Sequence, residues 1–153
     1  MIEIVRGDIL NATGVAAICH QVNCMNAMGS GVAKAIYSRW PEVKLKYHEY
    51  CSGKHPEELL GNVQIVYLNE FPSYNLVVLN IFGQLNYGKS GICYTDYSAL
   101  ERAFDEINSL CAQKSIALPY GFGCGLAGGD WQTVEKLIAK HLWNCYVKIY
   151  LKE

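Results

Sequence analysis

The sequence lacks any apolar run long enough to cross a membrane. None of its hydrophobic stretches approaches the roughly 20 residues that a spanning helix needs. The acidic start Met1-Ile2-Glu3 also lacks the basic-then-apolar order of a signal peptide. We therefore expect a cytoplasmic protein that has no membrane partner.

Neither sign of charge is in excess, and charged residues are not abundant. Lysine plus arginine number 13 and aspartate plus glutamate 14, while 51% of the residues are hydrophobic and 18% charged. The high apolar content argues against disorder, and the balanced charge argues against tight nucleic-acid binding by charge alone. The 153 residues suit one core, and no linker or low-complexity tract divides them, so we expect a single domain over 1–153.

The cysteines form no paired motif. They are odd in number, no two stand in a CxxC spacing, and most lie in apolar runs, which predicts reduced thiols without a disulfide framework or a zinc ribbon. No familiar spacing joins them to the histidines, and we expect no metal and no cofactor. The seven are Cys19, Cys24, Cys51, Cys93, Cys111, Cys124 and Cys145.

Hydrophobic periodicity predicts six strands interleaved with helices. Alternating or continuous apolar runs typical of strands occur at 2–5, 15–19, 62–68, 75–81, 115–118 and 145–151. Helical spacing occupies 29–40, 41–51, 97–110 and 131–142. We expect the strands at 62–68 and 75–81 to pair antiparallel around Pro72, and 82–94 to be a loop. This order predicts a three-layer α/β/α domain with a mixed, about six-stranded sheet and helices on both faces.

Seven of the 14 glycines lie in two strand-to-helix loops. The first loop is 20–31, with Gly29 and Gly31 before a helix, and the second is 119–130, which contains five glycines. Backbone amides in such loops, together with a helix N-terminus, can hold an anion. Each loop alone is more often a structural turn, but two facing one crevice suit a diphosphate. Neither fits GxxxxGK[ST] or GxGxxG with its acidic partner, which disfavours ATP hydrolysis and dinucleotide oxidoreduction.

The third notable loop is 82–94, which is long and rich in tyrosine, glycine and amide side chains. Loops of this length commonly form lids or binding segments. We therefore expect it to contribute to the same site.

These three loops together with Gly7-Asp8-Ile9 resemble the macrodomain family of ADP-ribose-binding modules. The first loop ends in MGSGVAKAI and the second reads PYGFGCGLAGGDW. The resemblance covers essentially the whole chain and is strongest to the branch that contains the ADP-ribose-phosphate phosphatase, the terminal ADP-ribose glycohydrolase and an antitoxin that removes ADP-ribose from DNA. The two glycine motifs are specific for the family and much less so for any one activity.

The resemblance implies which residues hold ADP-ribose. Asp8 would accept a hydrogen bond from the adenine amino group, the Ile9 N–H would reach a ring nitrogen, and Tyr150 would stack on the base. Their alternatives are a turn aspartate after Gly7 and a half-buried strand tyrosine. The residues expected around the diphosphate and the riboses are Asn23, Asn26, Gly29, Ser30, Gly31, Val32, Gly121, Gly123, Cys124, Gly125 and Leu126.

The match to the catalytic residues of the family is incomplete. The glycohydrolase has an aspartate directly after GCGL, where this chain has Ala127, and its lysine falls near 82–84, which contains none. Lys89 would substitute only if the loop folds back. For Cys124, no basic neighbour favours a thiolate, so we expect its backbone to contribute.

The remaining catalytic candidates are His20, Asn26, Asp130 and the tyrosines of the third loop. A histidine is a plausible general acid or base, although His20 ends an apolar run and a satisfied core histidine is the alternative. Asp130 precedes a helix and is equally explained as its N-cap. The other histidines, His48, His55 and His141, lie among polar residues and are expected to face solvent.

Three functions remain open at this point. The first is a hydrolase that binds ADP-ribose and removes from its terminal ribose either a phosphate or the protein or nucleic acid to which it is attached. In this hypothesis a water is positioned by Asn26, His20 or the substrate's own phosphates. The second is a non-catalytic ADP-ribose reader. The third is a generic nucleotide-binding α/β domain. We expect a monomer in each case.

Overall fold

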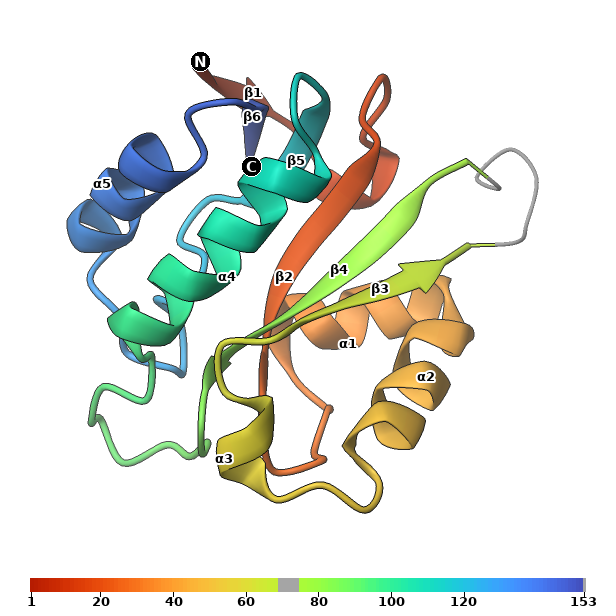
Figure 1. Cartoon of the computed structure of the whole chain (residues 1–153), viewed down its shortest axis with the longest axis vertical. Helices are drawn as coiled ribbons and strands as arrows, with labels where there is room; N and C mark the ends of the chain where they lie inside the picture. The colour runs from red at the N-terminus through yellow and green to blue at the C-terminus, as the bar shows by residue number, and fades with distance from the viewer. Residues whose placement is uncertain (69–74, 153) are drawn as a thin grey trace.

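A six-stranded mixed sheet forms the middle layer of the molecule (Figure 1). The computed structural model describes residues 1–68 and 75–152. The strand order is β1-β6-β5-β2-β4-β3. The strands are β1 (Ile2–Arg6), β2 (Ala17–Asn23), β3 (Val63–Tyr67), β4 (Val77–Gln84), β5 (Ser115–Pro119) and β6 (Tyr146–Leu151). The helices are the 3-10 turn η1 (Ile9–Asn11), α1 (Gly31–Arg39), α2 (Pro41–Cys51), α3 (Pro56–Leu59), α4 (Tyr97–Leu110) and α5 (Trp131–His141).

Strand direction places most strand ends at one edge of the sheet. β3 pairs antiparallel with β4, as the sequence predicts, and the other neighbouring strands run parallel. The predicted turn around Pro72 lies outside the described residues. Because parallel strands end together, the loops after β2, β4 and β5 meet at their carboxyl edge, where ligands gather in such sheets.

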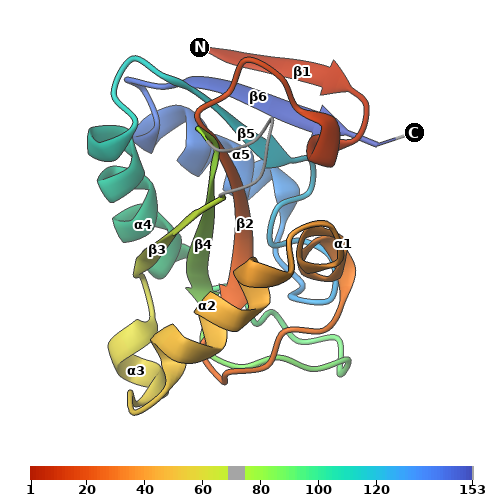
Figure 2. The ribbon, with the colours of Figure 1, turned by 90° about the vertical axis from the view of Figure 1, so that its right-hand side faces the viewer.

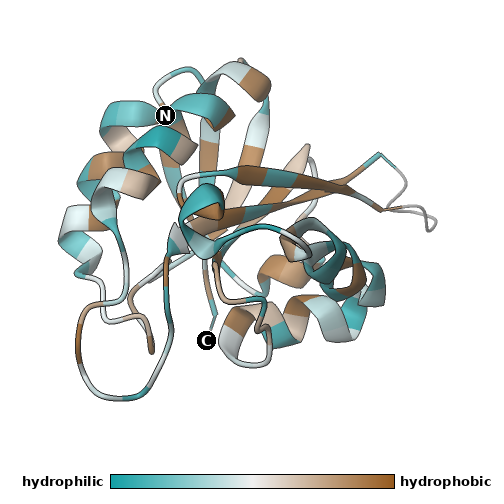
Figure 3. Cartoon of the chain, turned by 60° about the horizontal axis from the view of Figure 1, so that its bottom comes forward, coloured by the Kyte–Doolittle hydropathy of each residue, from teal (hydrophilic) through white to brown (hydrophobic). Residues whose placement is uncertain are grey.

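Helices cover both faces of the sheet, which confirms the predicted three layers (Figure 1 and Figure 2). α4 and α5 bury their apolar stripes on one face, where Phe104 and Ile138 are fully enclosed. α1 and α2 cover the other face with Ile36, Trp40 and Tyr47. Hydrophobic residues are concentrated along the strands, whereas the helices alternate in hydropathy (Figure 3). This pattern is that of amphipathic helices on a buried sheet.

Two strand ends extend beyond the sequence prediction, and each extension brings polar residues into a strand. β2 begins at Ala17 and continues to Asn23, and β4 continues through Gln84. The added polar residues continue the strands because β2 and β4 pair with each other there, with His20 opposite Asn80 and Asn23 opposite Gln84. An apolar periodicity cannot detect such pairs. Likewise η1 and α3 were not predicted, because elements of three or four residues are too short to show a period.

β1 is a sheet edge and is more exposed than an alternating half-buried strand would be. Ile4 is 48% exposed although it pairs with buried Ile149 of β6. Among the described residues, no helix combines the length and apolar character needed to span a bilayer.

Candidate ligand-binding site

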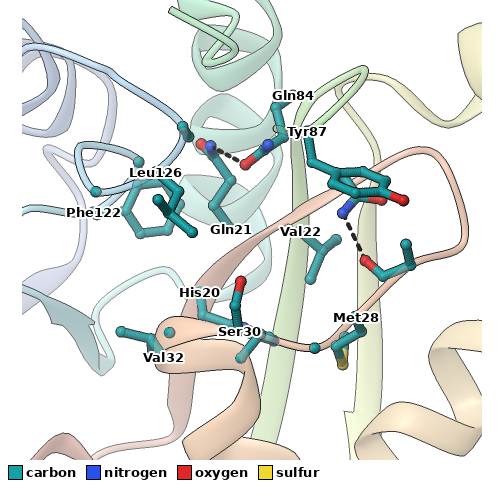
Figure 4. Close-up of a pocket in the computed structure, with 18 of the residues that line it drawn as sticks. His20, Gln21, Val22, Met28, Ser30, Val32, Gln84, Tyr87, Phe122 and Leu126 are labelled. Carbon is teal, nitrogen blue, oxygen red and sulfur yellow. Dashed lines mark hydrogen bonds between the residues drawn. The ribbon is translucent and has the colours of Figure 1, made fainter. Parts of the chain in front are cut away.

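A pocket of about 810 Å³ lies at the carboxyl ends of β2, β4 and β5 (Figure 4). Its size falls within the range of small-ligand sites, about 300–1,000 Å³. The three loops singled out in the sequence all contribute to its lining, and α2 supplies a fourth side. The sheet topology therefore brings the two glycine loops to one cavity, as predicted.

The first loop ends at a helix N-terminus that lacks a side-chain cap from its own N-cap residue. Ser30 is the N-cap of α1, but its hydroxyl makes no capping hydrogen bond, and the first turn contains no acidic residue. Gly31 adopts φ +61°, a left-handed conformation that favours glycine, and both Gly31 and Val32 line the pocket. The first-turn N–H groups of a helix lack intrahelical partners and give a positive potential. The uncapped N-terminus of α1 is therefore suited to an anion.

Polar contacts to neighbouring segments fix the shape of the first loop. Asn23 lines the pocket, but its amide donates to the Ala27 carbonyl (2.6 Å) and its Oδ1 accepts from the Met25 N–H (2.9 Å). The Tyr47 hydroxyl of α2 donates to the Asn23 carbonyl (2.8 Å). Asn23 thus holds the loop, and a role in holding a ribose stays a prediction.

Asn26 connects the first loop to α2. It occupies the left-handed region at φ +58°, and its Oδ1 lies 2.5 Å from the His48 Nδ1. Asn26 is exposed and lies outside the pocket lining, whereas His48 and Lys44, one turn apart on α2, line it. His48 is partly exposed, as expected, but it also borders the pocket, which the sequence did not predict. His141, expected to face solvent, is also partly enclosed and pairs with Asp105, while His55 is exposed as expected.

The second loop is held by its own turns. The Cys124 N–H donates to the Gly121 carbonyl (2.8 Å) and the Gly129 N–H to the Gly123 carbonyl (2.9 Å). Gly121 and Gly123 have φ values of +76° and +72°. Within the described chain, the N–H groups of Gly125, Leu126 and Ala127 donate to no other residue. Because all three line the pocket, they offer further donors to a ligand.

Cys124 is not a nucleophile in this arrangement. Its Sγ contacts the Phe122 carbonyl (3.2 Å), and burial together with the charge of Asp130 raises the thiol pKa to about 11. The thiol is therefore protonated at neutral pH. Cys124 also lies outside the lining, and its N–H is used within the loop, so the predicted backbone contact with ligand would have to come from its neighbours Gly123 and Gly125.

The third loop closes against the second. Tyr94 and Thr95 donate their N–H groups to the Ala127 carbonyl (2.6 and 3.1 Å), and the Thr95 hydroxyl donates to the Gly123 carbonyl (2.6 Å). This fold brings Tyr87 and Lys89 to the pocket rim. Lys89 therefore meets the condition under which it could stand in for the missing lysine, and that substitution stays a prediction.

Gln21 links the three loops. Its Nε2 donates to the Gln84 Oε1 (2.8 Å) and to the Thr95 hydroxyl (3.0 Å), and Figure 4 shows its side chain directed at Gln84. Gly83 and Gly123 make room for it, since a Cβ on Gly123 would lie 2.9 Å from the Gln21 Oε1. Gln84 stands in the segment where the resemblance places the lysine of the glycohydrolase. Its side-chain amide is engaged in this network and with the Asn86 carbonyl (2.8 Å).

His20 lies under the pocket as a buried residue. It is 1% exposed, lines the pocket, and places its Nε2 2.5 Å from the Asn80 Oδ1. Burial lowers its pKa from 6.5 to about 4, so the ring is neutral at pH 7. The structure thus favours the core-histidine alternative, at a position that still borders the ligand space.

Asp130 is the N-cap of α5, which is the alternative to a catalytic role that its sequence position allowed. Its Oδ2 accepts from the Thr133 N–H (3.0 Å) and hydroxyl (2.8 Å), and these bonds lower its pKa. It lies outside the pocket lining. The geometry therefore gives no support to Asp130 as a catalytic residue.

The residues expected at the adenine lie at the same sheet edge but outside the lining. Asp8 caps η1 by accepting from the Leu10 N–H (2.9 Å), and its Oδ2 lies 3.8 Å from the Lys152 Nζ. Ile9 is buried and Tyr150 is partly buried in one hydrophobic cluster. The Tyr150 carbonyl accepts from the N–H of Tyr120, which lines the pocket (2.9 Å). Their contact with adenine stays a prediction.

The charged side chains of the lining are basic. Among the described residues that line the pocket, Lys44 and Lys89 carry positive charge, His20 and His48 are titratable, and none has a carboxylate. No group of three or more His, Cys, Asp or Glu in the described chain is placed to hold a metal ion. Sequence reasoning missed Gln21, Lys44 and Gln84. For Lys44, the spacing to His48 shows a shared helix face, but not that this face borders the pocket.

Comparison with known proteins agrees with this geometry. The family model described as "Macro domain" matches residues 19–138. A DNA ADP-ribosyl glycohydrolase of Mycobacterium tuberculosis is 28% identical over 89% of this chain, which spans 37% of the length of that relative. An ADP-ribose 1''-phosphate phosphatase of Debaryomyces hansenii is 24% identical, with 99% of both chains covered. The solved structure of a macrodomain protein from Streptomyces coelicolor has a TM-score of 0.77 and 30% identity, covering 98% of each chain.

Proposed function

The chain belongs to the Macro domain family, and on this basis we propose that it binds ADP-ribose in the pocket described above. The diphosphate lies between the uncapped N-terminus of α1 and the N–H groups of the second loop. The observation that carries this proposal is that, within residues 1–68 and 75–152, donors from two different loops remain without protein acceptors and border one cavity whose lining has no carboxylate. Backbone donors at a helix N-terminus are a general solution for phosphate binding.

The orientation of the ligand follows from the sheet edge. The adenosine end extends toward η1 and the end of β6, where Asp8, Ile9 and Tyr150 lie. The terminal ribose then extends toward the first and third loops. The residues proposed to contact the ligand between these ends are Asn23, Gly29, Ser30, Gly31, Val32, Gly121, Gly123, Gly125 and Leu126.

We further propose that the domain hydrolyses an ADP-ribosyl derivative at the terminal ribose. The relatives named as hydrolases support this at modest identity. In the reaction a water oxygen bonds to the electrophilic phosphorus or anomeric carbon, the bond to the leaving group breaks with its electron pair, and the proton lost by the water passes to the leaving group or to solvent. The free N–H groups of the loops stabilise the negative charge that develops.

The basic rim favours an anionic leaving group among the possible substrates. Lys44, His48 and Lys89 border the cavity on the side of α2 and the third loop. A phosphate on the terminal ribose carries charge that complements this rim, whereas a carboxyl ester to protein carries none at the linkage. ADP-ribose phosphorylated on the terminal ribose is therefore the first substrate to test, before ADP-ribosylated protein or nucleic acid.

A non-catalytic reader is the second candidate, and a specific observation favours it. Ala127 stands where the family's glycohydrolase has its aspartate, and the segment that holds its lysine ends in Gln84, whose amide is bonded to Gln21 and Asn86. Neither residue can form a covalent adduct or take up a proton. The seven cysteines are all free thiols, and we propose on this basis that the protein works in a reducing compartment such as the cytoplasm, whether it is a hydrolase or a reader.

Two measurements separate these functions. Calorimetry with ADP-ribose and with AMP tests binding, and failure to bind ADP-ribose below the millimolar range would contradict both candidates. Release of inorganic phosphate from ADP-ribose phosphorylated on the terminal ribose, and of ADP-ribose from modified protein and DNA, tests hydrolysis. We expect turnover by the wild type and its loss in an Asn26→Ala, His20→Ala double variant. Binding without turnover of any of the three substrates would establish a reader.

A further inference from the structure

A row of three buried polar side chains crosses the sheet beneath the pocket. His20 of β2 pairs with Asn80 of β4, and Asn80 pairs with Gln64 of β3, so the three side chains share the sheet face that α2 covers. They are 1%, 0% and 8% exposed. Paired positions on adjacent strands bring such side chains into contact, and here each one hydrogen bonds to the next.

The direction of every hydrogen bond in this row is fixed from one end. The Lys46 carbonyl of α2 can only accept, so the Gln64 group 2.9 Å from it is the donating Nε2. The Gln64 Oε1 then faces the Asn80 Nδ2, which donates to it (2.9 Å). Asn80 is left with its Oδ1 toward the His20 ring, at 2.5 Å from Nε2. Because Oδ1 can only accept, the proton of neutral His20 is on Nε2.

The other ring nitrogen is consequently an acceptor that lacks a donor. In the described chain the His20 Nδ1 is buried and has no hydrogen-bond partner. With the tautomer fixed, Nδ1 bears a lone pair, in a residue that lines the ligand pocket next to the start of α1 (Figure 4). Nδ1 itself has less than 1 Å² of exposed surface, so a ligand group reaches it only through a small shift of the ring or of the first loop. Buried polar atoms are almost always paired in folded proteins, so an orphaned acceptor at a pocket indicates a missing donor.

We propose that Asn80 and Gln64 are positioning residues, which hold His20 as the Nε2–H tautomer so that Nδ1 accepts a hydrogen bond from a ribose hydroxyl of the bound ligand. This inference rests on the proposed binding of ADP-ribose. A deprotonated phosphate oxygen has no hydrogen to donate and would face the lone pair unfavourably. A hydroxyl group satisfies it, which makes the row a device that distinguishes a ribose from a phosphate at this point of the pocket.

Nitrogen NMR on the wild-type protein tests the tautomer directly. Two-dimensional ¹H–¹⁵N spectra of the histidine rings report which nitrogen carries the proton. At pH 7 we expect His20 to be neutral and protonated on Nε2, and we expect the Nδ1 resonance to move on addition of ADP-ribose while Nε2–H remains. ADP, which carries one ribose, and ADP-ribose, which carries two, identify the ribose that donates. Protonation on Nδ1, or an Nδ1 resonance unmoved by saturating ADP-ribose, would overturn the proposal.

Substitutions test the positioning role of Gln64, which lies outside the pocket lining. In Gln64→Leu the Asn80 amide is free to rotate, so we expect a mixture of His20 tautomers. Only the fraction protonated on Nε2 offers the acceptor, so we expect a loss of ADP-ribose affinity of about twofold for an even mixture and more if the other tautomer dominates. Gln64→Glu, protonated in this buried place, keeps a donor toward the Lys46 carbonyl and an acceptor toward Asn80. We expect it to restore both the tautomer and the affinity.

A matched control separates positioning from general loss of stability. Asn108 on α4 accepts from the Asn144 N–H (2.7 Å) in a partly buried contact remote from the pocket. Asn108→Leu should lower stability without changing the His20 tautomer or the affinity. Equal affinity losses in Asn108→Leu, Gln64→Leu and Gln64→Glu would contradict the proposal. Absence of ADP-ribose binding in the wild type would instead contradict the proposed function, and the tautomer measurement stands without it.

Discussion

The two glycine loops look alike in the sequence, but they present their helices differently. Each follows a buried strand and precedes an amphipathic helix. The first ends at the N-terminus of α1, which has no side-chain cap and opens onto the pocket. The second ends at α5, whose N-terminus is capped by Asp130 and lies outside the lining. The Asp130 N–H is itself held by the Tyr97 hydroxyl (2.9 Å).

This difference changes the role of the second loop. Only the first of these two loops offers a helix N-terminus to a ligand, while the second contributes the wall and the free N–H groups of Gly125 to Ala127. The diphosphate is therefore not expected to lie symmetrically between two helix ends. A carboxylate that caps a helix neutralises the positive potential of its N-terminus, whereas an uncapped N-terminus keeps that potential for an anionic ligand.

Closing the uncapped N-terminus of α1 should have the largest effect. In Ser30→Asp the new carboxylate caps the first turn and repels a diphosphate, so we expect about a thousandfold loss of ADP-ribose affinity, with stability unchanged or increased. Calorimetry and urea denaturation measure the two quantities. Ser38→Asp, which adds the same charge to an exposed position of α1 away from the lining, is the control. Undiminished binding by Ser30→Asp would show that this N-terminus does not hold the ligand.

The strands beneath the loops should differ in their response to acid. β2 carries buried His20, whereas β5 carries no titratable side chain. Burial lowers the pKa of His20 from 6.5 to about 4, so between these pH values the unfolded chain binds a proton that the folded chain does not. The free energy of unfolding should therefore fall by up to about 3 kcal/mol as pH drops from 7 to 4.

Denaturation in urea at several pH values checks this contribution against a variant. His20→Gln keeps an amide donor toward Asn80 and cannot titrate, so its stability should decline less over the same range. The carboxylates common to both proteins cancel in the comparison. Parallel pH curves for the two proteins would mean that His20 is not held in its neutral form by the fold.

A substitution in the second loop should have an intermediate effect. Gly123→Ala places a side chain at φ +72° and within 2.9 Å of the Gln21 Oε1, so we expect a loss of about 1–2 kcal/mol in stability and weaker ADP-ribose binding. Gly53→Ala is matched for backbone strain, at φ +76°, but meets no atom within 4 Å. It should lose stability and keep its affinity. If both variants bind equally well, Gln21 does not shape the pocket.

The smallest effect on binding is expected at the capped helix. Asp130→Ala removes the bonds to Thr133 and should lower the urea midpoint. ADP-ribose affinity should stay within about twofold, since a helix end outside the pocket contributes little to binding. Calorimetry measures the ADP-ribose affinity of this variant, for comparison with the large loss expected in Ser30→Asp. A large loss of affinity here would restore the symmetric arrangement of the two loops.

The sequence was sufficient for the architecture because apolar periodicity and glycine placement are local signals. The antiparallel pair, the helix stripes and the Asp130 cap were all predictable from residues near one another in the chain. The sequence was insufficient where the role of a residue depends on contacts across the sheet. Nothing local to Lys44 indicates that α2 borders the pocket, and the surroundings of His20 are set by Asn80, 60 residues away.

The structure of the protein with ADP-ribose bound tests the central claim most directly. We predict that oxygens of the diphosphate accept hydrogen bonds from the first-turn N–H groups of α1, with Gly125 or Leu126 on the opposite wall, and that none contacts the start of α5. A diphosphate bound at α5, or a ligand whose phosphates lie away from the N-terminus of α1, would contradict this account of the two loops.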